Sequence, residues 1–385
     1  MESDIFCGLV EINYVNLKGN KLQYLHPDTF SDLPNLETLY LSKNSDLQIP
    51  TDRQFITSHS LKDLDISGCS VSSVSVATFM NVPALEWLVL SYNNLRGLDV
   101  NTLRVLPELS ALNLNYNETS EIIPCTFEKY SLLKYLDLSH NKIEHLENDV
   151  FCGLVKINYI NLEANKLQYL HPDTFSGLPN LETLYLSENS DLQIPNDRHF
   201  ITSHSLQHLG ISGCNARSVS YTTFANVPAL EWLDLSYNNL RGLDINTLLI
   251  LPKLSVLYLY ENPLHCNSQL LELLRWCQHR IETTFYGEKA PDCVTPWYLK
   301  DVSFGDLKNN PSLQDIKGII FDLNFENHEI EQQKSIIIKV YELIRRVRIP
   351  VVYVLSTFGI TGNVILVIII TCNKKMQSIP LHVHP

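Results

Sequence analysis

The nine cysteines are the residues of this chain with the most evident chemistry, because paired thiols bind zinc or close disulfides. They are Cys7, Cys69, Cys125, Cys152, Cys214, Cys266, Cys277, Cys293 and Cys372. None stands in a CxxC pair, so the spacing predicts no metal site and no bound cofactor. The chain also lacks GxSxG, HExxH and GxxxxGK[ST] phrases, and its histidines are scattered. We therefore expect a protein that is not an enzyme.

The charge of the chain narrows the kinds of partner it can bind. The formal net charge is -13 over 385 residues, and the sequence pI is about 5.4. A negative surface repels polyanions, so the composition argues against nucleic acid. A protein or peptide partner carrying basic residues fits better.

An internal repeat dictates the elements that must position any functional side chain. The pattern LxxLxLxxN, with aliphatic substitutions, occurs in eleven units spaced 24 or 25 residues apart. The units begin at Ile12, Leu36, Leu61, Leu85, Leu109, Leu133, Ile157, Leu181, Leu206, Leu230 and Leu254. This period is typical of leucine-rich repeats, in which each unit adds one short strand to a shared parallel sheet. The predicted fold is an α/β solenoid with that sheet on its concave face and an irregular convex side.

The last position of the pattern is expected to hold a buried asparagine whose amide bonds the backbone of neighbouring turns. In the third and ninth units this position is Cys69 and Cys214, which we interpret as buried substitutes rather than reactive thiols. Asn117 begins the single Asn-Glu-Thr glycosylation motif. It is also a ladder asparagine, so we expect its amide to be buried and unmodified.

A longer repeat is superimposed on the short one. The segment DIFCGLVEINYVNLKGNKLQYLHPDTF returns as DVFCGLVKINYINLEANKLQYLHPDTF at an offset of 145 residues, from Asp4 to Asp149. Surface features should therefore recur six repeats apart. Two interpretations are open, binding of two partner copies or a recent duplication without functional meaning.

The residues between the aliphatic positions of each strand alternate toward the concave, solvent-facing side. These columns hold nine aromatic and five acidic residues but one lysine. Exposed Trp and Tyr anchor protein interfaces, although aromatic residues also suit an exposed strand for local reasons. The predicted ligand-binding residues are Tyr135, Asp137, Tyr159, Glu163, Tyr185, Trp232, Asp234, Tyr258 and Tyr260.

The repeats and their flank resemble extracellular leucine-rich-repeat proteins of the receptor and adhesion type. The phrase NPLHCNSQLLELLRWCQHRIETTFYGEKAPDCVTP is similar to the cysteine-rich C-terminal cap of that family. Family caps usually open with CxC, whereas Ser268 stands at the second position here and one expected bridge is missing. The resemblance implies a Cys266–Cys293 disulfide, with Cys277–Cys293 as the alternative. The family's N-terminal cap and a signal peptide are both missing, which suggests a truncated start.

Residues 350–372, PVVYVLSTFGITGNVILVIIITC, carry no charge and are long enough to span a bilayer as a helix. The phrase GITGN and the following NKKMQSIP resemble the first transmembrane helix and inner loop of rhodopsin-like G-protein-coupled receptors. The alternative is a generic single span. The resemblance implies that Gly359, Gly362 and Asn363 pack against partner helices.

The charges around this segment disagree with the family resemblance about orientation. Arg345, Arg346 and Arg348 precede it and Lys374 and Lys375 follow it, which by the positive-inside rule places the repeats in the cytosol. The cap cysteines and the resemblance imply a membrane protein with extracellular repeats. The expected parts are a solenoid at 1–264, a cysteine-rich flank at 265–312, a linker at 313–349, the membrane helix at 350–372 and a tail at 373–385.

The predicted function is binding of a protein or peptide ligand on the concave face by a membrane-anchored receptor ectodomain. On the resemblance, it is a truncated leucine-rich-repeat G-protein-coupled receptor. The alternative is a cell-surface adhesion or scaffold protein with one span and no signalling activity.

Overall fold

The computed structural model of the chain describes residues 1–2, 5–97, 101–128, 130–265, 273, 293–295, 352–358 and 364–370. It divides into two compact units, the first made of Met1–Asn239 and Asn246–Leu259 and the second of Leu240–Ile245 and Tyr260–Pro385. The positions of the two units relative to one another are not determined. The candidate site lies in the first unit.

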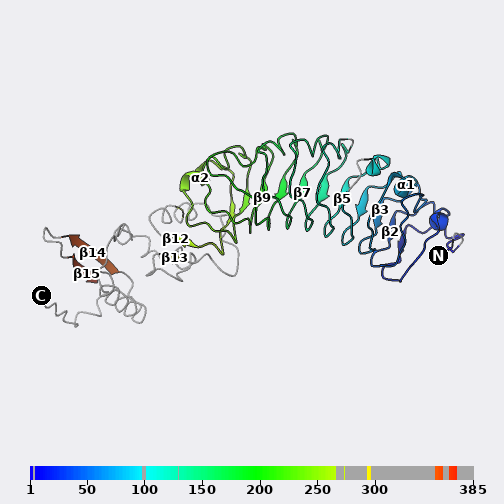
Figure 1. The fold of residues 1–385 in the computed structure, drawn as a ribbon, viewed down its shortest axis with the longest axis horizontal. Helices are drawn as coiled ribbons and strands as arrows, with labels where there is room; N and C mark the ends of the chain where they lie inside the picture. Colours follow the sequence, from blue (N-terminus) through cyan, green and yellow to red (C-terminus); the bar gives the residue numbers. More distant parts are fainter. Residues whose placement is uncertain are drawn as a thin grey trace. The chain divides into compact units, whose positions relative to one another are not determined.

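The first unit is a solenoid whose strands form one eleven-stranded parallel sheet in sequence order (Figure 1). The strands are β1 (Tyr14–Asn16), β2 (Thr38–Tyr40), β3 (Asp63–Asp65), β4 (Trp87–Val89), β5 (Ala111–Asn113), β6 (Tyr135–Asp137), β7 (Tyr159–Asn161), β8 (Thr183–Tyr185), β9 (His208–Gly210), β10 (Trp232–Asp234) and β11 (Val256–Tyr258). Each falls where the repeat predicts it, so the predicted solenoid is confirmed. The middle residue of every strand is aliphatic and buried, and its two neighbours belong to the opposite face.

The side of the coils away from the sheet is irregular, with single helical turns where repeats form any helix. These are η1 (Pro27–Phe30), α1 (Val76–Phe79), η2 (Thr102–Val105) and α2 (Ile245–Leu249). A column of fully buried phenylalanines fills this side: Phe30, Phe55, Phe79, Phe127, Phe151, Phe175, Phe200 and Phe224. Strands stack closely in the hydrogen-bonding direction while these turns need more room, so the sheet lies on the concave face.

The asparagine ladder has the predicted geometry. The Asn165 amide donates to the carbonyl oxygens of Leu138 at 2.9 Å and Leu162 at 3.0 Å. Its Oδ1 accepts the backbone N–H of Ile143 at 3.0 Å. Each coil is therefore tied both to itself and to the coil before it, and the side chain is buried. Burial makes these bonds obligatory, because an unmade one leaves a polar backbone group without water.

The two cysteine positions are confirmed as buried members of this ladder. The thiols of Cys69 and Cys214 each donate to a carbonyl of the preceding coil, of Leu41 and Leu186, at 3.3 Å. Both follow the two repeats that are one residue longer. In those repeats the N–H groups of Leu47 and Leu192 bond a backbone carbonyl of their own coil instead of a side-chain oxygen. The extra residue thus removes the need for a side-chain acceptor at the ladder position of the next coil. A cysteine, whose thiol only has to donate, can therefore replace asparagine there.

Duplication does not give matched cysteines the same environment. Cys152 matches Cys7 in the repeat, but burial, together with the neighbouring Cys125 thiol, raises the pKa of Cys152 to about 12. Cys7 is exposed. Alkylation requires the thiolate, so we expect iodoacetamide at pH 8 to label Cys7 at least about tenfold faster than Cys152 in the reduced native protein. Peptide mass spectrometry over time, with Cys7→Ser as the control, measures the rates, and equal rates would contradict the structure.

The second unit contains two short pairs of strands. β12 (Leu264–His265) pairs in parallel with β13 (Cys293–Thr295), which places Leu264 opposite Cys293. Cys266 and Cys277 lie outside the described residues, so both proposed disulfides stay predictions. The strand pair brings the start of the cysteine-rich flank beside its last cysteine.

The predicted membrane helix at 350–372 is wrong in the described part of that segment. Val352–Phe358 (β14) and Val364–Ile370 (β15) pair as antiparallel strands instead. Uninterrupted apolar runs do not distinguish helix from strand by periodicity, and Val, Ile and Thr favour strands. Within the described residues no helix has both the length and the hydropathy to cross a bilayer. Gly359, Gly362 and Asn363 lie outside the described residues.

Candidate functional site

The predicted concave residues come together as a continuous ladder of aromatic rings, which we call the aromatic ladder. Tyr135 stacks on Tyr159 with ring centroids 4.5 Å apart. The Tyr159 ring meets the edge of Tyr185 at 5.8 Å, and Tyr185 meets Trp232 at 6.1 Å. Trp232 then contacts Tyr258 edge-on at 5.3 Å. The rings are half-buried, largely against one another, and keep an exposed surface above the sheet.

The ring of Tyr185 passes close over the backbone of the intervening strand β9 to reach Trp232. Gly210 lies beneath it, and a Cβ added at Gly210 would come within 2.7 Å of the Tyr185 ring. A side chain on β9 at this position would therefore push the ring away. The missing side chain is what lets aromatic contact continue from β8 to β10.

Burial perturbs the acids and phenols of this face. Desolvation raises the pKa of Tyr159 to about 12 and raises the pKa of the Glu163 and Asp234 carboxyls above their usual range. Asp234 Oδ1 accepts the backbone N–H of Ser236 at 2.8 Å, which opposes that rise. Partly desolvated carboxylates without a cation gain most from a positive group brought by a partner.

Asp137 does not fit its predicted role as an exposed contact. It is 4% exposed, and its Oδ1 accepts Ser139 Oγ at 2.7 Å and Ser139 N at 3.0 Å. Its Oδ2 accepts the Asn115 amide at 3.0 Å and the Tyr135 hydroxyl at 3.3 Å. Donors from its own coil and from the preceding coil thus use its hydrogen-bonding capacity, and Asp137 fixes the ladder instead. Tyr260 belongs to the second unit.

Two aromatic features were missed by sequence reasoning. Trp87 extends the ladder toward the N-terminus, with its ring 5.9 Å from Tyr135, and is 45% exposed. Tyr92, Tyr116 and His140 form a second stack at the turns after β4, β5 and β6, with centroids 4.3 and 4.0 Å apart. Their 24-residue spacing was a usable signal, since equal positions in consecutive coils must lie side by side.

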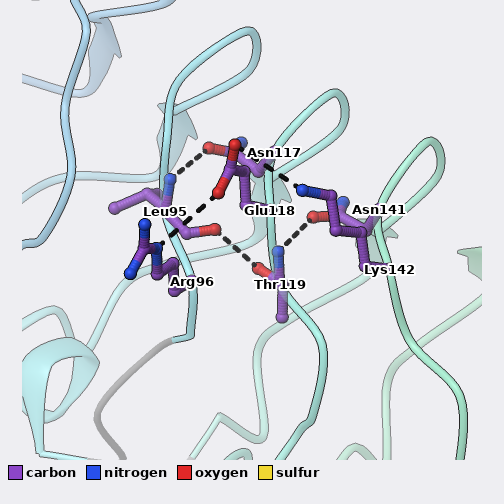
Figure 2. Close-up of polar contacts among 7 residues, drawn as sticks. All are labelled: Leu95, Arg96, Asn117, Glu118, Thr119, Asn141 and Lys142. Carbon is purple, nitrogen blue, oxygen red and sulfur yellow. Dashed lines mark hydrogen bonds and ion pairs between the residues drawn. The ribbon is translucent and has the colours of Figure 1, made fainter.

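The glycosylation motif has the buried geometry that the sequence predicts (Figure 2). Asn117 donates to the carbonyls of Leu90 at 2.9 Å and Leu114 at 3.0 Å. Its Oδ1 accepts the Leu95 N–H. Thr119 N donates to Asn141 Oδ1 at 3.0 Å, so the second essential residue is also held.

We expect Asn117 to carry no glycan when the chain is produced in a secretory pathway, because a glycan on Nδ2 would break the ladder. The control is Arg198→Thr, which creates an Asn-Asp-Thr motif at the exposed Asn196. Glycopeptide mass spectrometry should find Asn196 modified in that variant and Asn117 unmodified in the same folded material. Full occupancy of Asn117 in folded protein would contradict the ladder assignment.

The chain is similar to known proteins over the solenoid. The family profile described as "Leucine rich repeat" matches residues 1–45, 59–119, 107–167, 160–216 and 204–264, together more than half of the chain. Tsukushi of Gallus gallus is 31% identical over 94 residues, which are 24% of this chain and 26% of Tsukushi.

Two solved structures share the fold. A chain of the mouse RP105/MD-1 complex superposes with a TM-score of 0.59 at 20% identity, covering 77% of this chain and 54% of that one. A chain of the octameric complex of Latrophilin 3, Unc5D and FLRT2 gives 0.53 at 20% identity, covering 77% and 95%. This chain thus spans about a quarter of its curated relative and about half of the RP105/MD-1 chain. On the repeat-by-repeat match to the family profile, the chain belongs to the leucine-rich-repeat family.

Proposed function

We propose that this chain binds a protein partner on its concave face, with the aromatic ladder as the anchor. The observation that carries the proposal is the unbroken ring contact from Trp87 through Trp232 to Tyr258. Rings that brace one another lose little conformational entropy on binding and bury large areas, the properties of interface hot spots. Sheet propensity alone does not require rings to touch in an unbroken series over eight coils.

The partner presents basic side chains to this face. Glu163 and Asp234 flank the ladder, and desolvation by burial raises the pKa of both carboxyls. A Lys or Arg placed beside them relieves that desolvation and adds orientation to the hydrophobic contact. The net charge of -13 also favours encounter with a basic partner.

The fold that this chain shares with its structural neighbours favours a receptor or adhesion role outside the cell. One structural neighbour is in complex with MD-1 and the other is in a complex of Latrophilin 3, Unc5D and FLRT2. Membrane attachment has only the uncharged composition of residues 350–372 in its favour, since β14 and β15 replace the expected helix, and the receptor class rests on the GITGN resemblance alone. The alternative is adhesion or scaffolding without signalling. Transcript sequencing beyond this segment separates them, since a series of membrane-spanning segments encoded there would favour the receptor.

The experiment that tests binding uses the full chain as bait against an array of purified extracellular proteins. Any partner is then remeasured with a Tyr185→Ala, Trp232→Ala double variant and with a Tyr221→Ala, Tyr237→Ala control, whose side chains are 57% and 58% exposed outside the ladder. The proposal requires loss of binding in the ladder variant alone. The proposal would be overturned if a partner binds the ladder variant normally but does not bind the control variant.

Acid is expected to weaken this binding without weakening the fold through the same groups. As pH falls through the raised pKa values of Glu163 and Asp234, both carboxylates take up protons and lose their attraction for a cation. Their folded-state pKa values lie above the unfolded ones, so that protonation favours the folded state. Affinity measured by titration calorimetry should drop as pH is lowered from 7 toward the raised pKa values of these carboxyls, and Asp234→Asn should flatten the drop. A pH-independent affinity would argue against basic recognition.

A further inference from the structure

The first copy of the duplicated block contains a hollow on the concave face. Its volume is about 340 Å³, and it is lined by Tyr40 on β2, Asp63, Leu64 and Asp65 on β3, and Trp87 and Val89 on β4. Asp63 lies directly beside Trp87 in the sheet, and Tyr40 lies directly beside Asp65. The floor thus carries two carboxylates and the walls carry two aromatic rings. We call these four residues, Tyr40, Asp63, Asp65 and Trp87, the socket.

The duplicated strands show how the hollow stays open. At an offset of 145 residues, Tyr185 and Trp232 match the aromatic walls, whereas His208 and Gly210 match the two aspartates. Over Gly210, Tyr185 leans across the strand and meets Trp232, filling the equivalent space. Asp65 occupies the position where that ring would lie. Tyr40 contacts Tyr14 edge-on at 5.5 Å, as Tyr185 contacts Tyr159, and the hollow lies between Tyr40 and Trp87.

The two carboxylates have hydrogen-bonding capacity left over. Asp63 Oδ2 accepts the Thr38 hydroxyl at 3.3 Å, and Asp65 Oδ1 accepts the backbone N–H of Ser67 at 2.9 Å. In the described part of the chain neither forms an ion pair, and Lys62 next to them is paired with Glu37 at 2.7 Å. Desolvation raises the pKa of Asp63, and this effect outweighs the opposing effects of the Thr38 hydroxyl and the Lys62 ammonium. The site is therefore anionic and only partly satisfied.

An arginine side chain has the chemistry that fits these four groups together. Its guanidinium is planar, stacks on aromatic faces and donates through a fork to carboxylate oxygens. A cation near a Trp ring is also attracted by the ring's quadrupole. We propose that the socket receives one arginine side chain of the protein partner. This proposal rests on the proposed concave-face function. It adds the type of partner side chain that the first copy of the block binds.

The test uses the full chain with 5-fluorotryptophan, whose 19F signals for Trp87 and Trp232 are assigned with Trp87→Phe and Trp232→Phe. The probe is the peptide acetyl-Gly-Arg-Gly-amide, compared with the same peptide carrying citrulline, which has nearly the same shape without the charge. We expect the Trp87 signal to shift on titration with the arginine peptide, with a Kd of about 1 mM. The citrulline peptide should bind at least about tenfold more weakly.

Substitutions locate the effect. Asp63→Asn and Asp65→Asn should each weaken arginine binding about tenfold, while Asp234→Asn, at the position of the second copy that corresponds to Val89, should leave the Trp87 response unaltered. Asp65→Gly, which restores the residue of the second copy, should abolish it, with circular dichroism confirming the fold. Equal binding of citrulline, or equal loss in Asp234→Asn, would overturn the socket. If the Trp87 signal does not respond to the arginine peptide but the ladder variant loses partner binding, the socket alone is rejected. If the Trp87 signal responds but the ladder variant still binds the partner, the ladder alone is rejected.

Discussion

Replacing Asn165 by alanine should destabilise the solenoid by about 3 kcal/mol, the largest effect expected from one polar side chain. The Ile143 N–H would lose its acceptor inside the stack, and the carbonyl groups of Leu138 and Leu162 would each lose one donor. The adjacent asparagines Asn141 and Asn189 also donate to those two carbonyls, which limits the damage. Urea denaturation followed by circular dichroism measures the change in unfolding free energy.

The duplication supplies a matched control at Asn20, which occupies the same repeat position as Asn165. Asn20 is exposed, and its amide donates to Lys18 O at 3.2 Å within its own coil. Asn20→Ala should therefore cost less than about 0.5 kcal/mol. Equal losses for the two variants would mean that the ladder bonds between coils contribute little, contrary to their burial.

Replacing Trp232 by alanine should weaken partner binding by about 100-fold, the largest effect expected on function. Its ring contacts Tyr185 at 6.1 Å, His208 at 6.4 Å and Tyr258 at 5.3 Å. The substitution therefore removes one hot spot and also removes the ring contact that helps to hold each of these three side chains. Biolayer interferometry with an identified partner would register most of the change in the dissociation rate.

Tyr237→Ala is the control for this variant, because Tyr237 lies in the same repeat and is 58% exposed at the turn after β10. We expect its affinity to stay within about twofold of the unsubstituted chain. If Tyr237→Ala instead abolishes binding and Trp232→Ala does not, the partner binds the edge of the solenoid.

The sequence was sufficient for the solenoid because repetition makes each position informative about all coils. A leucine at equal positions in eleven units has to be buried in each, and this predicted the middle residue of every strand from Val15 to Leu257. The ladder role of Asn117 and Cys69 followed from the same alignment of units. These features depend on position in the repeat alone.

The details of the concave face depend on side-chain conformation and on neighbouring coils, which no single repeat specifies. Asp137 was expected at the surface, but Asn115 from one coil and Ser139 from its own cover it with donors. The Tyr185 contact with Trp232 depends on an unrelated glycine on the strand between them. At Val352–Phe358 and Val364–Ile370 there is no repeat to consult, and an apolar run was interpreted as a helix.

Hydroxyl-radical footprinting of the full chain, free and bound to a protein partner, tests the binding face most directly. Bound partner should protect Trp232, Tyr185 and Tyr258 from oxidation and leave Tyr237 and Tyr221 unchanged. Protection of Tyr237 and Tyr221, with Trp232 oxidised as fast as in the free protein, would place the partner elsewhere and contradict the account.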